Sequence, residues 1–176
     1  MTAIKMSPQA VGAYGEKIVE AALLRRGWIP SNVNASIKNA AQFDLVAQSR
    51  AGQIVPIRVK TCGPGQDAFQ FGFKPGPVPM HDLRDVDFTV LIAMGENPAA
   101  DQFYIMPTCT VREALESGRK AFYARLKKDG EPRIETGQIT LWLRPLRSGI
   151  DDCQHAFADK WRQYLDAWHL LEGQTK

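Results

Sequence analysis

Apolar residues recur with a helical period in three stretches of the chain. The first helix is expected to begin at Ser7 and Pro8, which have the form of an N-cap followed by a first-turn proline, and to end at Gly27. The second is expected over residues 110–130 and the third over residues 150–171. The predicted buried stripes are Val11, Tyr14, Ile18 and Ala22, with Leu23 as a further candidate; then Val111, Leu115, Phe122 and Leu126; then Phe157, Trp161, Leu165 and Trp168.

Shorter runs predict strands, either because apolar and polar residues alternate or because the run is apolar throughout. The runs are "WIPSNVN", "QFDLVAQ", "IVPIRVK", "VDFTVLIAMG", "QFYIMP" and "GQITLWLRP". "SRAG" is typical of a hairpin turn between the second and third runs. The Gly- and Pro-rich residues 63–79 contain "AFQFGFK", a short strand or a loop that we expect over one mouth of the candidate site.

This order of elements predicts an α/β protein, with α+β as the alternative, in which helices flank a central mixed sheet. A chain of 176 residues with 44% hydrophobic residues suits one domain. We expect the motif-bearing core over about residues 8–107 and a helix–strand–helix region over about residues 108–172.

Composition narrows the classes of function. The net charge of +3 permits binding to a polyanion but does not require it. Three widely spaced cysteines without a CxxC pair argue against a disulfide framework and against a zinc site. No apolar run has the length of a signal peptide or a membrane span, so we expect a cytoplasmic protein with no membrane partner.

Three ionisable residues suggest a metal-dependent phosphodiester site. Glu16 lies on the first helix, Asp44 in "QFDLVA" and Lys60 in "IRVKT". Since side chains alternate along a strand, Arg58 and Lys60 leave the same face, and pairing through the hairpin can bring Asp44 to that side. Carboxylate oxygens are ligands that Mg²⁺ prefers, and a nearby ammonium offsets charge on the attacking water or the phosphate.

"GAYGEKIVEAALLRRGW" and "FDLVAQSRAGQIVPIRVKT" together resemble the PD-(D/E)XK nuclease superfamily, in particular its Holliday-junction-resolvase and bacterial homing-endonuclease-like members. The resemblance covers about residues 12–61 and rests on Gly15 with Glu16, Asp44 and Lys60. It implies a restriction-endonuclease-like fold, catalytic roles for these three ionisable residues, and Mg²⁺ or Mn²⁺ held by Asp44 and Glu16 in an active enzyme. It also implies a nucleic-acid substrate, DNA before RNA, and by analogy a homodimer.

The sequence departs from the family at Arg58, where an acid or a glutamine is usual. Arginine offers no acceptor to a metal. Two unit charges about 4 Å apart interact by about 4 kcal/mol at an effective dielectric near 20, and a divalent ion roughly doubles this repulsion. Arg58 would then pair with Asp44 or Glu16, unless it turns outward to bind phosphate or Asp67 supplies the missing acid.

The sequence leaves three functions open. The first is a nuclease-like nucleic-acid-interacting protein with a compromised metal site, for which the candidate contacts are Arg58, Thr61 and Lys74. The second is an active Mg²⁺-dependent endonuclease that hydrolyses DNA phosphodiesters. The third is a catalytically silent protein-interaction module. The basic run "RKAFYARLKK" at residues 119–128 is explained first by stabilisation of a helix C-terminus and second by contact with a nucleic-acid backbone.

Overall fold

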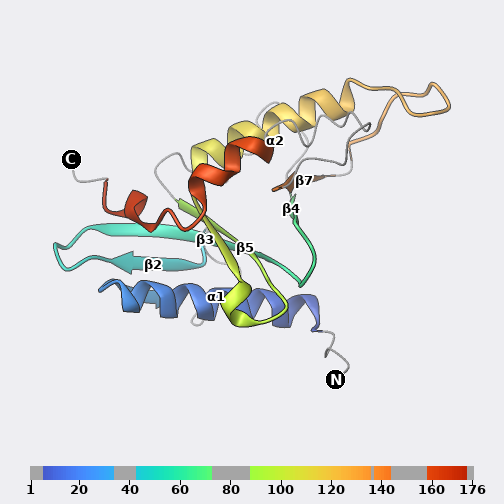
Figure 1. The fold of residues 1–176 in the computed structure, drawn as a ribbon. Helices are drawn as coiled ribbons and strands as arrows, with labels where there is room; N and C mark the ends of the chain where they lie inside the picture. Colours follow the sequence, from blue (N-terminus) through green and yellow to red (C-terminus); the bar gives the residue numbers. More distant parts are fainter. Residues whose placement is uncertain (1–5, 34–42, 73–87, 136, 144–157, 174–176) are drawn as a thin grey trace.

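A five-stranded mixed sheet forms the centre of the computed structural model, which describes residues 6–33, 43–72, 88–135, 137–143 and 158–173 (Figure 1). The strand order is β1-β2-β3-β5-β6, and of these pairs only β3 with β5 is parallel. The sheet strands are β1 (Ile29–Asn32), β2 (Leu45–Gln48), β3 (Ile54–Cys62), β5 (Phe88–Ala93) and β6 (Gln102–Pro107). The prediction of an α/β fold with a central mixed sheet flanked by helices is confirmed.

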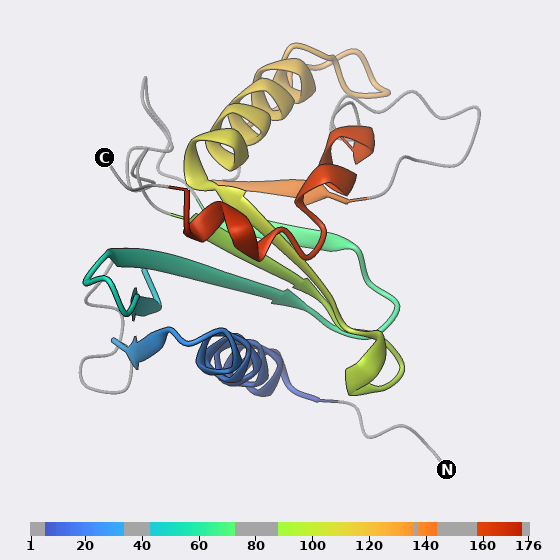
Figure 2. The same ribbon diagram turned by 60° about the vertical axis from the view of Figure 1, so that its left-hand side comes forward.

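The two faces of this sheet carry different layers (Figures 1 and 2). Helix α1 (Pro8–Arg25) covers one face through Val19 and Leu23, which pack with alternate residues of β3 such as Val55 and Ile57. The other face carries α2 (Thr108–Tyr123) and a separate antiparallel pair, β4 (Ala68–Gly72) with β7 (Gln138–Trp142). All six residues of β5 are buried, as expected for its uninterrupted apolar run.

Helix α1 lies closer to the sheet than its predicted stripe implies. Ser7 caps it as expected, and its hydroxyl oxygen accepts from the amide of Ala10. The fully buried line is Gly15, Val19 and Leu23, whereas Val11, Tyr14, Ile18 and Ala22 are half-buried beside it. The predicted stripe was therefore displaced around the helix axis. The reason is Gly15, which lets the helix backbone touch β3 at Thr61.

The predicted second helix was placed too far along the chain. Helix α2 begins at Thr108, directly after β6, and not at residue 110 as expected; its N-cap Pro107 makes no side-chain cap bond. The helix ends at Tyr123, and Leu126, predicted to be buried, is 61% exposed.

The predicted third helix was wrong over the part that the structure describes. Two 3-10 helices occur instead, η3 (Ala158–Tyr164) and η4 (Trp168–Leu171), and Asp166 between them has φ +50°. The amide of Asp166 donates to the carbonyl oxygen of Phe103, so this turn covers the β6 edge of the sheet. Trp161 and Trp168 are buried, as predicted for core residues; Phe157 is outside the described residues.

A further short 3-10 turn, η1 (Pro98–Ala100), precedes β6. Within the described ranges, no helix combines the length and the apolar character needed to cross a bilayer. Cys62 and Cys109 are free thiols.

Candidate functional site

Asp44 marks the point where β2 separates from β3. Its amide donates to the carbonyl oxygen of Ile57 at 2.9 Å, and its carboxylate Oδ2 accepts from the amide of Val59 at 2.7 Å. Leu45 is the first residue of β2 and pairs with Ile57, so the amide of Val59 would otherwise need a backbone acceptor beyond the strand. The carboxylate replaces that acceptor, which fixes Asp44 beside Arg58.

Arg58 and Lys60 leave the face of β3 opposite to α1. Ile57 and Val59, which alternate with them along the strand, point into the core under α1. Lys60 Nζ lies 5.4 Å from the centroid of the Phe71 ring in β4. Burial lowers the pKa of Lys60, the positive charge of Arg58 lowers it further, and the negative charge of Asp44 acts in the opposite direction. Two cations and one carboxylate therefore interact on this face.

The half-buried ammonium group of Lys60 should lower the stability of the fold while it is charged. We expect Lys60→Met to raise the free energy of unfolding at neutral pH by on the order of 1 kcal/mol, because it replaces a desolvated cation by an apolar side chain of similar length. The pKa of Lys60 is lowered in the folded state, so below this folded-state pKa the lysine is charged in both states and its destabilisation of the fold is complete. As the pH rises from the folded-state pKa toward the unfolded value of about 10.4, the folded protein loses the proton first and the destabilisation disappears.

Urea unfolding of the wild type and Lys60→Met from pH 7 to pH 10.5 would test this expectation. The stability difference should shrink as the pH rises. Lys17→Met, which changes a lysine that is 68% exposed on α1, should show no such trend. A difference between wild type and Lys60→Met that stays constant with pH would contradict the desolvated placement of Lys60.

Glu16 reaches the site region from the helix side of the sheet. Its Oε2 accepts from Asn32 Nδ2 at 2.9 Å, and the same nitrogen donates to Glu20 Oε1 at 3.0 Å. Asn32 pairs across β1 and β2 with Leu45, the residue after Asp44. Asn32 thus ties the carboxylate of Glu16 to the end of the sheet where Asp44 lies, while Arg58 and Lys60 project from the opposite face.

The remaining predicted residues occupy three different places. The hydroxyl of Thr61 is buried and lies against α1 at Gly15, on the face opposite to Lys60. Burial of the Cys62 thiol and, to a smaller extent, the negative charge of Asp67 raise the pKa of that thiol to about 11. Lys74 is outside the described residues. The roles given to these residues stay predictions.

The donor set does not fit the Mg²⁺ or Mn²⁺ that the resemblance implies. Asp44 and Glu16 each already accept a hydrogen bond, and the charge of Lys60 interacts with that of Asp44. Over the described part of the chain, no three His, Cys, Asp or Glu side chains gather in a way that could hold a metal ion. On the face of β3 that carries Arg58 and Lys60, two cations and the carboxylate of Asp44 leave a net positive charge, which repels a divalent cation and attracts an anion.

The first turn of α2 adjoins the same face. Thr108 Oγ1 and Thr89 Oγ1 share a hydrogen bond of 2.9 Å, and both side chains are buried. Thr89 is the residue of β5 that pairs with Arg58. The positive end of the α2 dipole and its uncapped amides therefore start beside Arg58, which adds to the attraction for an anion.

Three residues of this arrangement were absent from the sequence prediction. Asn32 orients Glu16, Phe71 lies under Lys60, and Thr108 anchors α2 next to Arg58. No local motif signals them, because each acts through a partner at least 11 residues away in the chain. Phe71 belongs to "AFQFGFK", the segment that the sequence was expected to place over one mouth of the candidate site.

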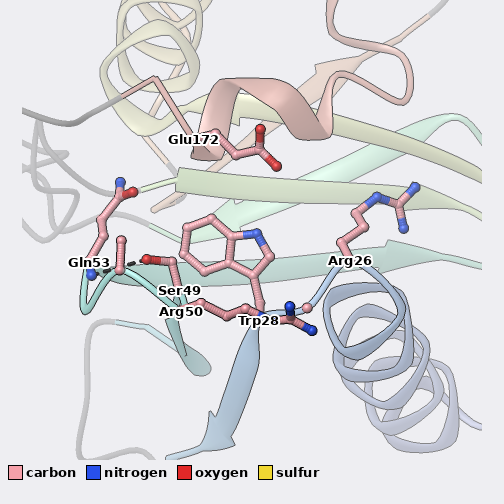
Figure 3. A pocket seen from close by; sticks show the side chains of 8 residues that line it. Arg26, Trp28, Ser49, Arg50, Gln53 and Glu172 are labelled. Atoms are coloured by element: carbon pink, nitrogen blue, oxygen red, sulfur yellow. Dashed lines mark hydrogen bonds between the residues drawn. The ribbon is translucent and has the colours of Figure 1, made fainter.

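A separate hollow of about 320 Å³ lies where α1 ends against the turn between β2 and β3 (Figure 3). Arg26, Trp28, Arg50 and Glu172 are among its lining residues. Arg26 is held by the last turn of α1, since its Nη1 donates to the carbonyl oxygen of Ala22. The hollow adjoins the start of β3, about 20 Å along the strand from Lys60 at about 3.3 Å per residue, so it is not part of the charged site.

Comparisons with known proteins give a likeness of fold. No protein-family model and no curated protein matches the sequence. Among solved structures, a bacterial homing endonuclease, I-Ssp6803I, is similar with a TM-score of 0.52 and 15% identity, over 94% of this chain and 93% of that chain. MepB aligns over 86% of this chain and 95% of that chain, with a TM-score of 0.33 and 9% identity, which is too low to support an inference. The central sheet with its flanking helices thus resembles a restriction-endonuclease-like fold.

Proposed function

We propose that this protein binds nucleic acid, DNA in preference to RNA, through a nuclease-like site in which Arg58 and Lys60 contact phosphate without a metal ion. The observation that carries the proposal is that Arg58 and Lys60 leave the same face of β3, while the amide of Val59 between them holds the carboxylate of Asp44. A half-buried lysine beside an arginine is costly for the fold, and such costs are concentrated at functional sites.

Phosphate suits these groups chemically. A guanidinium binds phosphate oxygens in a bidentate way, and an ammonium adds a point charge. The adjoining first turn of α2 supplies a positive dipole end. The fold likeness to a homing endonuclease supports nucleic acid as the source of that phosphate. A cation at Arg58 also favours a protein without metal-dependent cleavage, because the nucleases that the sequence resembles have an acid or a glutamine at the matching position.

Arg58→Ala combined with Lys60→Ala tests the proposal. Fluorescence anisotropy measures the association constant K for a labelled duplex of about 20 base pairs at salt concentrations from about 50 to about 200 mM, which gives the slope of log K against log salt. Loss of two phosphate contacts should reduce the magnitude of that slope by about 1.8. EDTA should leave wild-type binding unchanged. Lys17→Ala with Arg25→Ala removes two cations from α1 and should leave the slope near the wild-type value.

Two results would contradict the proposal. The first is a slope in the Arg58 and Lys60 double variant equal to that of the wild type. The second is nicking of supercoiled DNA that needs Mg²⁺ or Mn²⁺ and disappears in Lys60→Ala, which would identify an active endonuclease instead.

A further inference from the structure

The chain after α2 forms a projecting loop, residues 124–135, which we call the basic loop. Figures 1 and 2 show it extending beyond the end of α2, away from the five-stranded sheet. The amide of Lys127 donates to the carbonyl oxygen of Glu131 at 2.8 Å, and the amide of Gly130 donates to that of Lys127 at 3.1 Å. Residues 124–132 are all exposed. The turn therefore presents its side chains to solvent.

The end of α2 and the basic loop together hold the basic excess of the whole chain, and the basic loop alone, with four basic and three acidic residues, has a net charge of +1. Residues 119–135 contain six basic and three acidic residues, a net charge of +3, which equals the net charge of the complete chain. The rest of the chain is therefore balanced in formal charge. Arg119 pairs with Glu135 at 3.0 Å, and the guanidinium of Arg133 lies 4.3 Å from the centroid of the Phe122 ring.

The end of the helix explains little of this charge. Lys120 is the basic residue in the last turn of α2, and the helix ends at Tyr123. Arg125, Lys127 and Lys128 lie beyond it, in the turn. Because the dipole effect is limited to the last turn, stabilisation of the helix does not account for these three cations. This favours the second explanation of the basic run at residues 119–128, which is contact with a nucleic-acid backbone.

Two large apolar side chains accompany the cations. Leu126 is 61% exposed and Ile134 is 77% exposed. The core of a protein–protein interface is depleted in lysine, so a protein partner fits this mixture poorly. DNA fits it, since basic side chains contact phosphates while aliphatic side chains contact thymine methyl groups or wedge against bases in a groove.

Helix α2 connects the basic loop with the charged site. Its first residue, Thr108, lies beside the ladder partner of Arg58. Its 16 residues span about 24 Å at 1.5 Å per residue. That length corresponds to about seven base pairs of duplex at 3.4 Å each. A partner that touches both ends must be extended, as a duplex is.

We propose that the basic loop is a second contact for duplex DNA, in which Lys127 and Lys128 bind phosphates about 24 Å along α2 from Arg58. This inference rests on the proposed function and extends it to a footprint longer than the charged site. The duplex follows α2 from its first turn to the turn beyond Tyr123.

Lys127→Ala with Lys128→Ala tests this footprint in the full chain, with the same duplex and salt range as above. The slope should fall by about 1.8, and a variant that also carries Arg58→Ala and Lys60→Ala should lose about 3.6. The control remains Lys17→Ala with Arg25→Ala. Leu126→Ser with Ile134→Ser should weaken binding while leaving the slope unchanged, because apolar contacts release no counterions.

The outcomes separate the two proposals. If the wild type binds and only the Arg58 and Lys60 variant loses slope, the basic loop is not a DNA contact and the charged site stands. If only the loop variant loses slope, the loop contact stands and the charged site does not bind phosphate. Equal losses in the control and the loop variant, or no duplex binding by the wild type, would overturn the loop contact.

Discussion

Gly15→Ala is expected to lower the free energy of unfolding by about 2–3 kcal/mol, although alanine is the better helix former. A Cβ on Gly15 would overlap the hydroxyl oxygen of Thr61 and lie 2.9 Å from the Cβ of Thr61 and 3.2 Å from Cδ1 of Ile92. Thr61 is β-branched and belongs to β3, so it has little freedom to move aside. Helix α1 would have to shift away from the sheet.

Gly12→Ala is the matched control for this prediction. Gly12 lies on the same helix, and a Cβ there meets nothing within 4 Å. We expect it to stabilise the protein by up to about 1 kcal/mol, since alanine restricts the unfolded chain and favours the helix. Urea unfolding of both variants gives the comparison. Two variants with equal, small effects would show that α1 does not approach β3 as closely as described.

The same contact bears on the candidate site. Glu16 follows Gly15, so the distance of α1 from the sheet also sets the position of the carboxylate that Asn32 holds. Gly15→Ala should therefore disturb the Glu16–Asn32 hydrogen bond as well as the packing. The glycine that the family resemblance singled out next to the glutamate has a steric role that can be measured without any activity.

Elements defined by local pattern were predictable from the sequence. The apolar run of β5, the hairpin of β2 and β3, and the N-cap of α1 each depend on neighbouring residues. The pairing of β4 with β7 was missed because it joins strands 65 or more residues apart, such as Phe71 and Ile139. The third helix was wrong because Asp166 bonds to β6, which no local pattern encodes.

The candidate site was predicted in part for the same reason. The alternation of β3 placed Arg58 and Lys60 together, and the hairpin brought Asp44 beside them. The sequence could not give the amide of Val59 as the partner of Asp44, nor the tie between Glu16 and Asn32. These contacts depend on where β2 leaves β3 and on how closely Gly15 brings α1 to the sheet.

Arg58→Glu is expected to have the largest effect on metal binding, tightening the affinity for Mn²⁺ by at least about 100-fold, or about 2.7 kcal/mol. It replaces a cation by a carboxylate next to Asp44, whose charge already interacts with Lys60. A unit charge about 4 Å from a divalent ion contributes about 8 kcal/mol at an effective dielectric near 20. The reversal of sign is large enough to survive strong screening by water and counterions.

Calorimetric titration with Mn²⁺ measures this effect. Arg58→Gln, which removes the charge but keeps an oxygen acceptor, should fall between the wild type and Arg58→Glu. Arg162→Glu makes the same charge change on an exposed residue of η3 and should not bind Mn²⁺ more tightly. An unchanged affinity in Arg58→Glu would show that position 58 does not face the carboxylate of Asp44.

Adding Glu16→Gln to Arg58→Glu then tests the helix side of the site. If Glu16 turns from Asn32 to a metal ion, the double variant should bind Mn²⁺ at least tenfold more weakly than Arg58→Glu alone, a difference of about 1.4 kcal/mol. If the affinities are equal, the ion is held by Asp44 and the new carboxylate alone. The first result would mean that Arg58 is the main obstacle to metal binding in a site that is otherwise intact, and the second that the α1 side has also lost its role.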